Sequence, residues 1–473
     1  MAPLLGGATG LLAGLYPSVR AASLESAGGP TVHDVSRSGT TGRLPWFAAS
    51  LLSVGCVVVP CLFTTRLRDV FVVPKLAAVW VLLIAGLVLV ALSPLVRLPT
   101  GRPLRWCPAV DIAGISFVVL TVLATALSTD RHQSLFGERL QYQGLLTVLL
   151  YGGLFLLARH VIVDARRLTL LFSGITAGAV VVAGYAVLQK AGLDPFWKGF
   201  LPDGRVFSTF GQPNALAAYL VIALAPACHL AWVTRGAAQA VVLVAAAGIV
   251  GALLLTLSRG GFVGLVALMV VPLGVLLRRR LASAVAGFLV VASACALLVP
   301  AVRSAFSSRR GSQGRLSAEN HLDQWRVAGR IALDHPLLGT GPETFPDVFP
   351  RYSHAVLSPE RAAYFDSFRV ESAHNVYLTM AANIGLPALL AYLVLLGAVL
   401  VLVIRRAGSE TDKGLRLGLL ALAAGVLGHL ATDGFMSAEV TSSWLFWTLL
   451  GAAIGIATGP TKPRGRKEFA DHR

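Results

Sequence analysis

A lone arginine, Arg259, stands between two apolar runs in the segment Ser258-Arg259-Gly260-Gly261. An ionisable side chain at membrane depth is energetically costly and is a candidate for a functional site by default. Its guanidinium group carries a fixed fork of donors that matches the oxygens of a phosphate, and the glycines beside it allow close approach. The alternative is an arginine that reaches the outer lipid head groups. We favour the functional interpretation because a single arginine interrupts the apolar pair.

A second group of polar residues precedes the apolar run that starts near residue 214. Arg205 is another cation on the same side, and a solvated loop charge is the alternative for it. Pro213 and Asn214 fit the start of a helix, where asparagine caps the free backbone N–H groups. Capping is therefore the plain interpretation of Asn214, and substrate contact is the functional one.

A third group lies in the long polar segment that ends near residue 375. Arg326 and Arg330 are four residues apart, so they share one helix face, which could equally be a solvated surface. His374 stands where this segment returns to apolar sequence, and histidine exchanges protons near neutral pH. Glu371 is the nearest acid to it. His374 is thus the candidate base, with a purely structural histidine as the alternative.

Several other chemistries are not expected from this sequence. The remaining histidines of the long segment show no metal-ligand spacing with His374, so no metal site is predicted (His321, His335 and His354). The phosphate-loop pattern is absent. The net charge of +17 resides mainly in short links between apolar runs, without interleaved aromatic residues. Such links set orientation and meet anionic lipid, so membrane lipid is expected as a partner and nucleic acid is not.

The elements that must position these residues are predicted to be membrane-spanning helices. Of 473 residues, 55% are hydrophobic and only 13% are charged, against about 25% in soluble domains. The mean hydropathy is +0.72. A spanning helix needs about 20 apolar residues, which predicts about twelve spans. They are Pro45–Phe63, Phe71–Ser93, Ala109–Leu127, Gly144–Ala158, Leu168–Leu188, Asn214–Val233, Ala240–Leu257, Phe262–Leu277, Leu281–Pro300, Val376–Ile404, Leu415–Ala431 and Ser443–Ala457.

The predicted fold is an all-α integral membrane protein with one large, structured extracytoplasmic loop. Dense clusters of Lys and Arg fall in alternate short links, including Arg278–Arg280, which places both termini in the cytoplasm. The predicted parts are an N-terminal tail (1–44), a first bundle of about nine helices (45–300), the loop (301–374), about three C-terminal helices (375–458) and a basic tail (459–473).

Within the loop, residues 320–333 have the periodicity of an amphipathic helix, with Asn320 as its expected N-cap. The pair His335-Pro336 is expected to end that helix, and Gly339 and Gly341 permit a tight turn. A long, structured, polar loop is where recognition or chemistry is expected.

Taken in order, the motifs resemble the O-antigen ligase and polysaccharide polymerase superfamily. The likeness spans about residues 200 to 400. It is carried by Phe210-Gly-Gln-Pro-Asn214-Ala-Leu-Ala, Ser258-Arg259-Gly260-Gly261, Trp325-Arg326, His335-Pro-Leu-Leu-Gly-Thr-Gly341 and His374-Asn375-Val-Tyr-Leu378.

The resemblance implies a metal-independent membrane glycosyltransferase that needs no cofactor. Such an enzyme takes a glycan from an undecaprenyl diphosphate carrier and passes it to a hydroxyl of a glycan, lipid or protein acceptor, outside the bacterial cytoplasmic (inner) membrane. The expected catalytic residues are His374, Arg259 and Arg326. The expected substrate-binding residues are Arg205, Asn214, Arg330, Glu371 and Asn375. Ligase or polymerase activity, the sugar, the acceptor and the oligomeric state stay open.

Two other classes of protein compete with this interpretation. A transporter or flippase of lipid-linked glycans also has about twelve spans and buried charge, but it should show polar residues in mid-span and two matching halves. No convincing internal repeat is present, and the special residues gather on one side of the membrane. A non-catalytic scaffold for envelope assembly is the third possibility.

Overall fold

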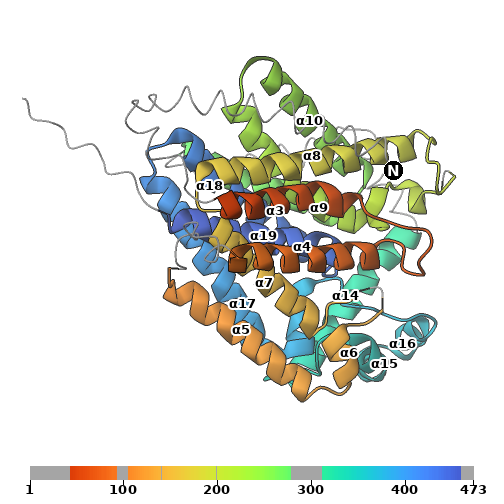
Figure 1. Ribbon diagram of the computed structural model, residues 1–473. Helices are drawn as coiled ribbons and strands as arrows, with labels where there is room; N and C mark the ends of the chain where they lie inside the picture. Colours follow the sequence, from red (N-terminus) through yellow and green to blue (C-terminus); the bar gives the residue numbers. More distant parts are fainter. Residues whose placement is uncertain (1–42, 93–104, 140, 199, 278–311, 460–473) are drawn as a thin grey trace, which may run out of the picture.

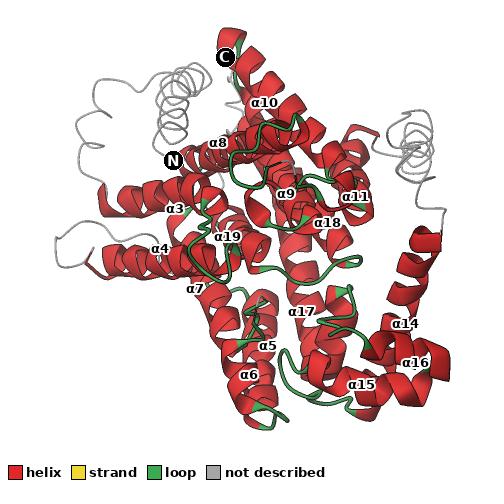
Figure 2. Ribbon diagram, turned by 90° about the vertical axis from the view of Figure 1, so that its right-hand side faces the viewer, coloured by secondary structure: helices red, strands yellow, loops and turns green. Residues whose placement is uncertain are grey.

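The computed structural model describes residues 43–92, 105–139, 141–198, 200–277 and 312–459. Throughout these ranges the regular secondary structure is helical, without strands (Figure 2). The predicted ninth span at residues 281–300, the arginine triplet at 278–280 and most of both tails lie outside the described residues. The prediction of an all-α protein is confirmed for the part of the chain that the structure describes.

The long helices coincide with the predicted apolar runs. Eight of them are long and apolar enough to cross a membrane, and three shorter apolar helices accompany them (Trp46–Cys61, Leu145–Val161 and Arg259–Val271). The multi-pass membrane architecture is therefore supported, while the total of twelve spans stays a prediction. In chain order the long helices are α3 (Arg43–Cys61), α4 (Val72–Leu92), α5 (Pro108–Ala126), α7 (Leu145–Val161), α8 (Ala165–Lys190), α9 (Pro213–Val233), α10 (Gly236–Leu255), α11 (Arg259–Leu277), α17 (Val376–Ser409), α18 (Lys413–Asp433) and α19 (Val440–Ala457).

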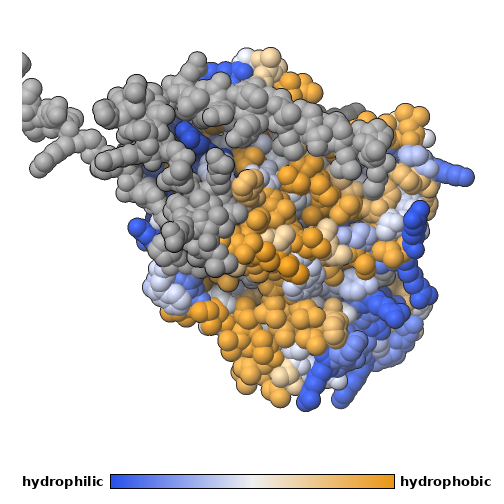
Figure 3. All heavy atoms as spheres, viewed as in Figure 1, coloured by the Kyte–Doolittle hydropathy of each residue, from blue (hydrophilic) through white to orange (hydrophobic). Residues whose placement is uncertain are grey.

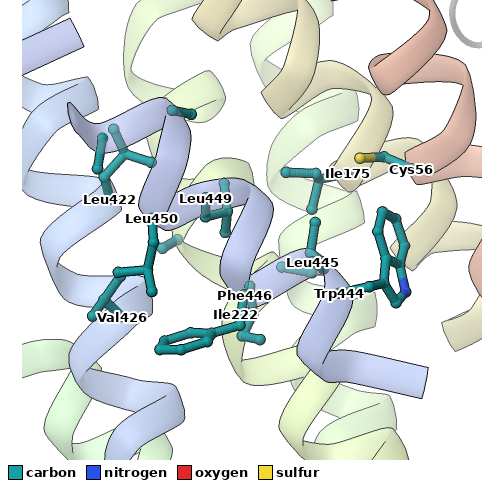
Figure 4. Close-up of a cluster of buried hydrophobic side chains, with 14 of the residues drawn as sticks. Cys56, Ile175, Ile222, Leu422, Val426, Trp444, Leu445, Phe446, Leu449 and Leu450 are labelled. Atoms are coloured by element: carbon teal, nitrogen blue, oxygen red, sulfur yellow. The ribbon is translucent and has the colours of Figure 1, made fainter. Parts of the chain in front are cut away.

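The interior of the bundle is built around α19, which is buried along its length (Figure 4). Its Leu450 lies close to Leu422 and Val426 of α18, and Leu445 points toward Ile175 of α8 (Figure 4). Small residues bring α19 against α7: a Cβ added to Gly451 would meet the backbone of Phe155. Because lipid is as apolar as the helix surfaces, the hydrophobic effect does not drive membrane helices together. They associate instead by close packing at small residues.

The shorter helices gather at one end of the bundle (Figure 1). They are α6 (Arg131–Phe136), α14 (Ser312–Asp334), α15 (Phe345–Val356) and α16 (Pro359–Asp366), with short 3₁₀ turns at Pro202–Gly204 and Ser208–Phe210. On the face shown in Figure 3, hydrophobic side chains form a broad band over the long helices, and hydrophilic ones gather over α6 and α14–α16. The polar end is thus distinct from the apolar body.

The described part of the long loop has a small core of its own. Val327 and Ile331 of α14 pack with Phe345, Phe349 and Phe365 of the next two helices, all of them buried. The predicted amphipathic helix is present, but it begins at Ser312 rather than at residue 320. The capping role expected for Asn320 was therefore wrong. Its side chain instead accepts a hydrogen bond from Arg361 Nη2 at 2.6 Å and donates one to the Tyr364 hydroxyl at 3.0 Å.

Helix α17 is broken near its start. Gly385 has φ 85° and ψ 167°, a conformation that only glycine adopts readily. The break frees carbonyl groups, and the turn after α14 satisfies them. The N–H groups of Thr340 and Gly341 donate to the carbonyls of Ala382 and Asn383, at 3.1 and 2.8 Å. Non-helical backbone in a membrane protein persists where other protein groups complete its hydrogen bonds.

Candidate functional site

A hydrogen-bonded network joins two sequence-distant segments at the polar end of the bundle. Asn214 Oδ1 accepts hydrogen bonds from Arg205 Nη2 at 2.7 Å and from Ser258 Oγ at 2.9 Å. Arg205 Nε also donates to the carbonyl of Thr256 at 2.7 Å. The capping interpretation of Asn214 was wrong, because Gln212 occupies the N-cap of α9. Asn214 instead fixes the segment that carries Arg205 against the link that precedes Arg259.

A buried lysine, Lys75 of α4, supports the same region. Its ammonium group donates to the carbonyls of Leu62 and Thr209, each at 2.6 Å, and lies 5.2 Å from the centre of the Phe210 ring. These contacts hold the turn that leads into α9. Lys75 was not among the residues predicted from the sequence. The available signal was that it is a single charge in an otherwise apolar run, the same criterion that identified Arg259.

Arg259 is the first residue of α11 and is half-buried. The preceding Ser258 accepts a hydrogen bond from the N–H of Gly261 at 3.2 Å, so it satisfies a free donor of the first helical turn. The glycines after Arg259 serve helix packing rather than ligand approach. A Cβ on Gly261 would lie 2.8 Å from the Cβ of Ala217, and one on Gly260 would lie 3.2 Å from the Cβ of Phe435.

Two histidines face each other beside this arginine. The rings of His321, on α14, and His374 are stacked with centroids 5.0 Å apart and planes inclined by 13°. Burial, together with smaller contributions from His374 and the positive charge of Arg259, lowers the pKa of His321 to about 4. Burial also lowers the pKa of His374 below its usual 6.5. Both imidazoles are therefore neutral at pH 7, and His374 is in the form that can accept a proton.

The backbone around His374 is held in an uncommon conformation. His374 has φ 48°, in the left-handed region that non-glycine residues seldom occupy. Its N–H donates to Ser372 Oγ at 3.1 Å, and its Nδ1 lies 3.4 Å from Ser437 Oγ. The next residue, Asn375, caps α17 by accepting the N–H of Leu378 at 3.0 Å. Strained backbone of this kind tends to occur at functional sites.

Asn375 and Glu371 occupy different positions around the histidine. The Asn375 amide also donates to the carbonyl of Gly434 at 3.1 Å, which ties the start of α17 to the end of α18. Glu371 is exposed and accepts a hydrogen bond of 3.4 Å from Gln141 Nε2. The contacts of Asn375 are structural ones, whereas Glu371 remains open to solvent.

The two arginines of α14 lie on another face of the helix from His321. The side chain of Arg326 is 68% exposed and pairs with Asp323 at 3.2 Å; that of Arg330 is 58% exposed and pairs with Asp334 at 3.1 Å. Trp325 instead packs toward the bundle, with its ring 6.4 Å from that of Phe435. The structure therefore groups Arg259 with the histidines and leaves Arg326 at the surface of α14. The assignment of Arg326 to catalysis stays a prediction.

His321 is the functional candidate that the sequence analysis missed. It was considered only as a metal ligand, and it lies 53 positions before His374. Among the described residues, no three His, Cys, Asp or Glu side chains are placed to hold a metal ion. What the group offers is a cation for developing negative charge and a neutral imidazole that can take up a proton.

Comparison with known proteins gives one finding that bears on this geometry. Residues 240–393 match the family model described as O-antigen ligase. The matched segment includes Arg259, the whole of α14 and the start of α17 with His374. No curated protein matches the chain. The match confirms the resemblance to the O-antigen ligase and polysaccharide polymerase superfamily, while Arg205 and Asn214 lie before the matched segment.

Proposed function

We propose that this membrane protein is an enzyme that transfers a glycan from undecaprenyl diphosphate to an acceptor hydroxyl, because residues 240–393 match the O-antigen ligase family model. The observation that carries the proposal is the stacked pair of neutral histidines within electrostatic reach of Arg259. Glycosyl transfer from a diphosphate needs these two functions, a base for the acceptor and a cation for the leaving group. The family match favours this activity over a transporter or flippase.

The placement of the charges supports the following reaction. The acceptor oxygen forms a bond to the anomeric carbon, and the bond from that carbon to the phosphate oxygen breaks. Undecaprenyl diphosphate leaves with the bonding electron pair, and the Arg259 guanidinium stabilises its added negative charge. His374 takes the proton of the acceptor hydroxyl. Arg205 and Asn214 hold the backbone link before Arg259, so their role in the proposal is to position that arginine.

The proposal includes a location for this chemistry. We infer that the polar end with α14–α16 lies outside the cytoplasmic membrane and that both termini lie inside. The positive-inside rule supports this orientation, because basic residues gather in the short links at the opposite ends of the helices. A lipid-linked donor would then reach Arg259 from the membrane edge, while a polar acceptor would approach from the aqueous side.

A transfer assay with purified components tests the function. The full chain in lipid nanodiscs is mixed with a glycan-loaded undecaprenyl diphosphate and a glycan acceptor, and products are identified by mass spectrometry. We expect an extended acceptor together with free undecaprenyl diphosphate. A matched sample of His374→Ala should form far less of both. Movement of intact lipid-linked glycan across a vesicle membrane, without release of free carrier, would instead indicate a flippase.

A further inference from the structure

A cavity lies beside Ser372, the residue whose hydroxyl accepts the N–H of His374, and neither stacked histidine lines it. Its volume is about 120 Å³, and residues of α5, α7, α17, α18, α19 and the turn at Pro342 and Glu343 line it. Aromatic side chains supply much of its wall, and neighbouring rings among them lie 5.6 to 6.2 Å apart: Phe117, Tyr151, Tyr392 and Trp447.

Polar atoms in the cavity wall lack hydrogen-bond partners among the described residues. They are Gln143 Nε2, Glu343 Oε2, Asn383 Oδ1 and His429 Nδ1; Gln143 is half-buried, and the other three residues are only 7%, 6% and 2% exposed. A buried polar atom without a partner costs about 1–3 kcal/mol, so such groups normally meet a ligand or water. Four such atoms around one space indicate a place for a hydrogen-bonding ligand.

The position of Glu343 is set by the loop turn. Ser134 Oγ donates to the carbonyl of Pro342 at 2.8 Å, and Gln133 Nε2 donates to the carbonyl of Glu343 itself at 2.7 Å. Gly341 has φ 118°, and a Cβ there would overlap Ser128. Glu343 has φ 62°, an uncommon conformation for a non-glycine residue. Burial, reinforced by nearby carboxylates, raises the pKa of Glu343 to about 8, so this group is mainly protonated at pH 7.

The composition of the wall selects the class of ligand. Among the described residues, no lysine or arginine lines the cavity, so these residues offer a diphosphate no cation. Aromatic faces combined with open donors and acceptors suit a neutral ring that carries hydroxyl groups. Ser372 connects the two sites: it lines the cavity, and its hydroxyl both accepts the N–H of His374 and shares a 2.5 Å hydrogen bond with Ser437.

We propose that this cavity binds a neutral sugar ring, held by Glu343, Asn383 and His429 against the aromatic wall. The inference rests on the proposed function, because it gives the glycan a subsite next to the base. The ring could belong to the donor glycan or to the acceptor glycan, and the two sources share the same recognition chemistry. In either case the enzyme separates its tasks, with the diphosphate at Arg259 and the sugar at the carboxyl-lined cavity.

Ligand-observed saturation-transfer NMR on the full chain in nanodiscs tests binding directly. The probes are methyl glycosides of neutral hexoses, 6-deoxyhexoses and N-acetylhexosamines. At least one should receive saturation from the protein, and Asn383→Leu should weaken its binding about tenfold, as expected for a lost buried hydrogen bond. Glu343→Gln is the second variant if the first fails to fold. No saturation of any glycoside by the wild type would overturn the inference.

A matched control is available on α14. Gln324 is also buried and also has a side-chain oxygen without a partner among the described residues, but it does not line the cavity. Gln324→Leu should leave glycoside binding as in the wild type. Equal loss of binding in Gln324→Leu and Asn383→Leu would show a general structural effect and overturn the assignment of the cavity.

The source of the sugar is resolved with the glycoside that binds best. If the cavity holds donor sugar, Asn383→Leu weakens binding of undecaprenyl diphosphate loaded with that sugar but not of the bare carrier. If it holds acceptor sugar, both carriers bind as before and the KM for that glycoside as acceptor rises about tenfold. If Asn383→Leu transfers glycan with unchanged binding of the loaded carrier and an unchanged KM for the acceptor, the cavity is not a sugar site. The proposed function would still stand. Glycoside binding by a wild-type protein without any transfer would refute the proposed function alone.

Discussion

Replacement of His374 distinguishes a general base from a residue that only orients the substrate. A positioned acid–base group contributes about 10²–10⁴-fold to a rate, so His374→Ala should reduce transfer by about that factor. Binding of the lipid carrier should persist, because Arg259 is untouched. Glutamine can hydrogen-bond but cannot accept the proton at neutral pH. His374→Gln should therefore be nearly as inactive as His374→Ala.

The pH profile follows from the surroundings of His374. Burial lowers its pKa below 6.5, and the deprotonated imidazole is the active form of a base. The acid limb of kcat/KM should then have its midpoint below pH 6.5, with a fall of about tenfold for each pH unit below that midpoint. Removal of the stacked ring in His321→Ala admits water beside His374. The midpoint should consequently move up toward 6.5, because desolvation is reduced.

The assay measures initial transfer rates between pH 4.5 and 8 at matched protein levels, with carrier binding measured in parallel. Neither alanine nor glutamine at position 374 tolerates a φ of 48° better than histidine does. Backbone strain therefore does not explain a difference in activity between His374→Ala and His374→Gln. A His374→Gln variant with activity close to the wild type and an unchanged pH profile would remove His374 from the role of base. Glu371, the nearest acid in the same segment, would then be tested.

Three further predictions concern the arginine, its support and the orientation in the membrane. Arg259→Lys should insert normally but lose most transfer activity, because an ammonium group cannot make two parallel contacts to phosphate; normal turnover would leave Arg259 as an orientation signal only. Asn214→Leu removes the oxygen that accepts from Arg205 and Ser258, which should lower the free energy of unfolding by about 1–3 kcal/mol. A thermal-shift assay should therefore show a lower melting temperature, and an unchanged melting temperature would refute the network. In a background without native thiols, a cysteine at exposed Ser358 should be labelled in intact cells and one at exposed Thr411 only after lysis; the reverse pattern would invert the topology.

The sequence was sufficient to predict the long apolar helices and to select two ionisable residues that the structure brings near a third. Apolar runs of spanning length depend only on local composition, and the structure has helices at each described run. Arg259 and His374 were identified because each is an ionisable residue at the edge of an apolar run. The structure places both within electrostatic reach of His321. That third residue carries no local signal, since its importance arises only when α14 docks on the bundle.

Other features were not predicted, because long-range contacts take the place of the local interactions that the sequence favours. Asn214 follows a proline at a helix start, so capping was the simplest reading, yet its oxygen accepts from residues 9 and 44 positions away. Gly341 was expected to permit a turn, and it does, but the sequence does not show that Glu343 then faces a cavity between five helices. Periodicity describes which face of a helix is apolar, not which partner covers a polar one.

The break at Gly385 has a practical consequence for protein engineering. Exchange of the segment with α14–α16 between relatives would be a way to change the substrates of the proposed enzyme, and the start of α17 near residue 375 would be the simplest place to cut. The backbone of residues 382 and 383, however, is completed by residues 340 and 341. A chimera cut at residue 375 would pair a foreign turn with the original broken helix and leave those carbonyls without matched donors. Grafts should therefore extend beyond Pro387, so that the turn and the break come from the same parent.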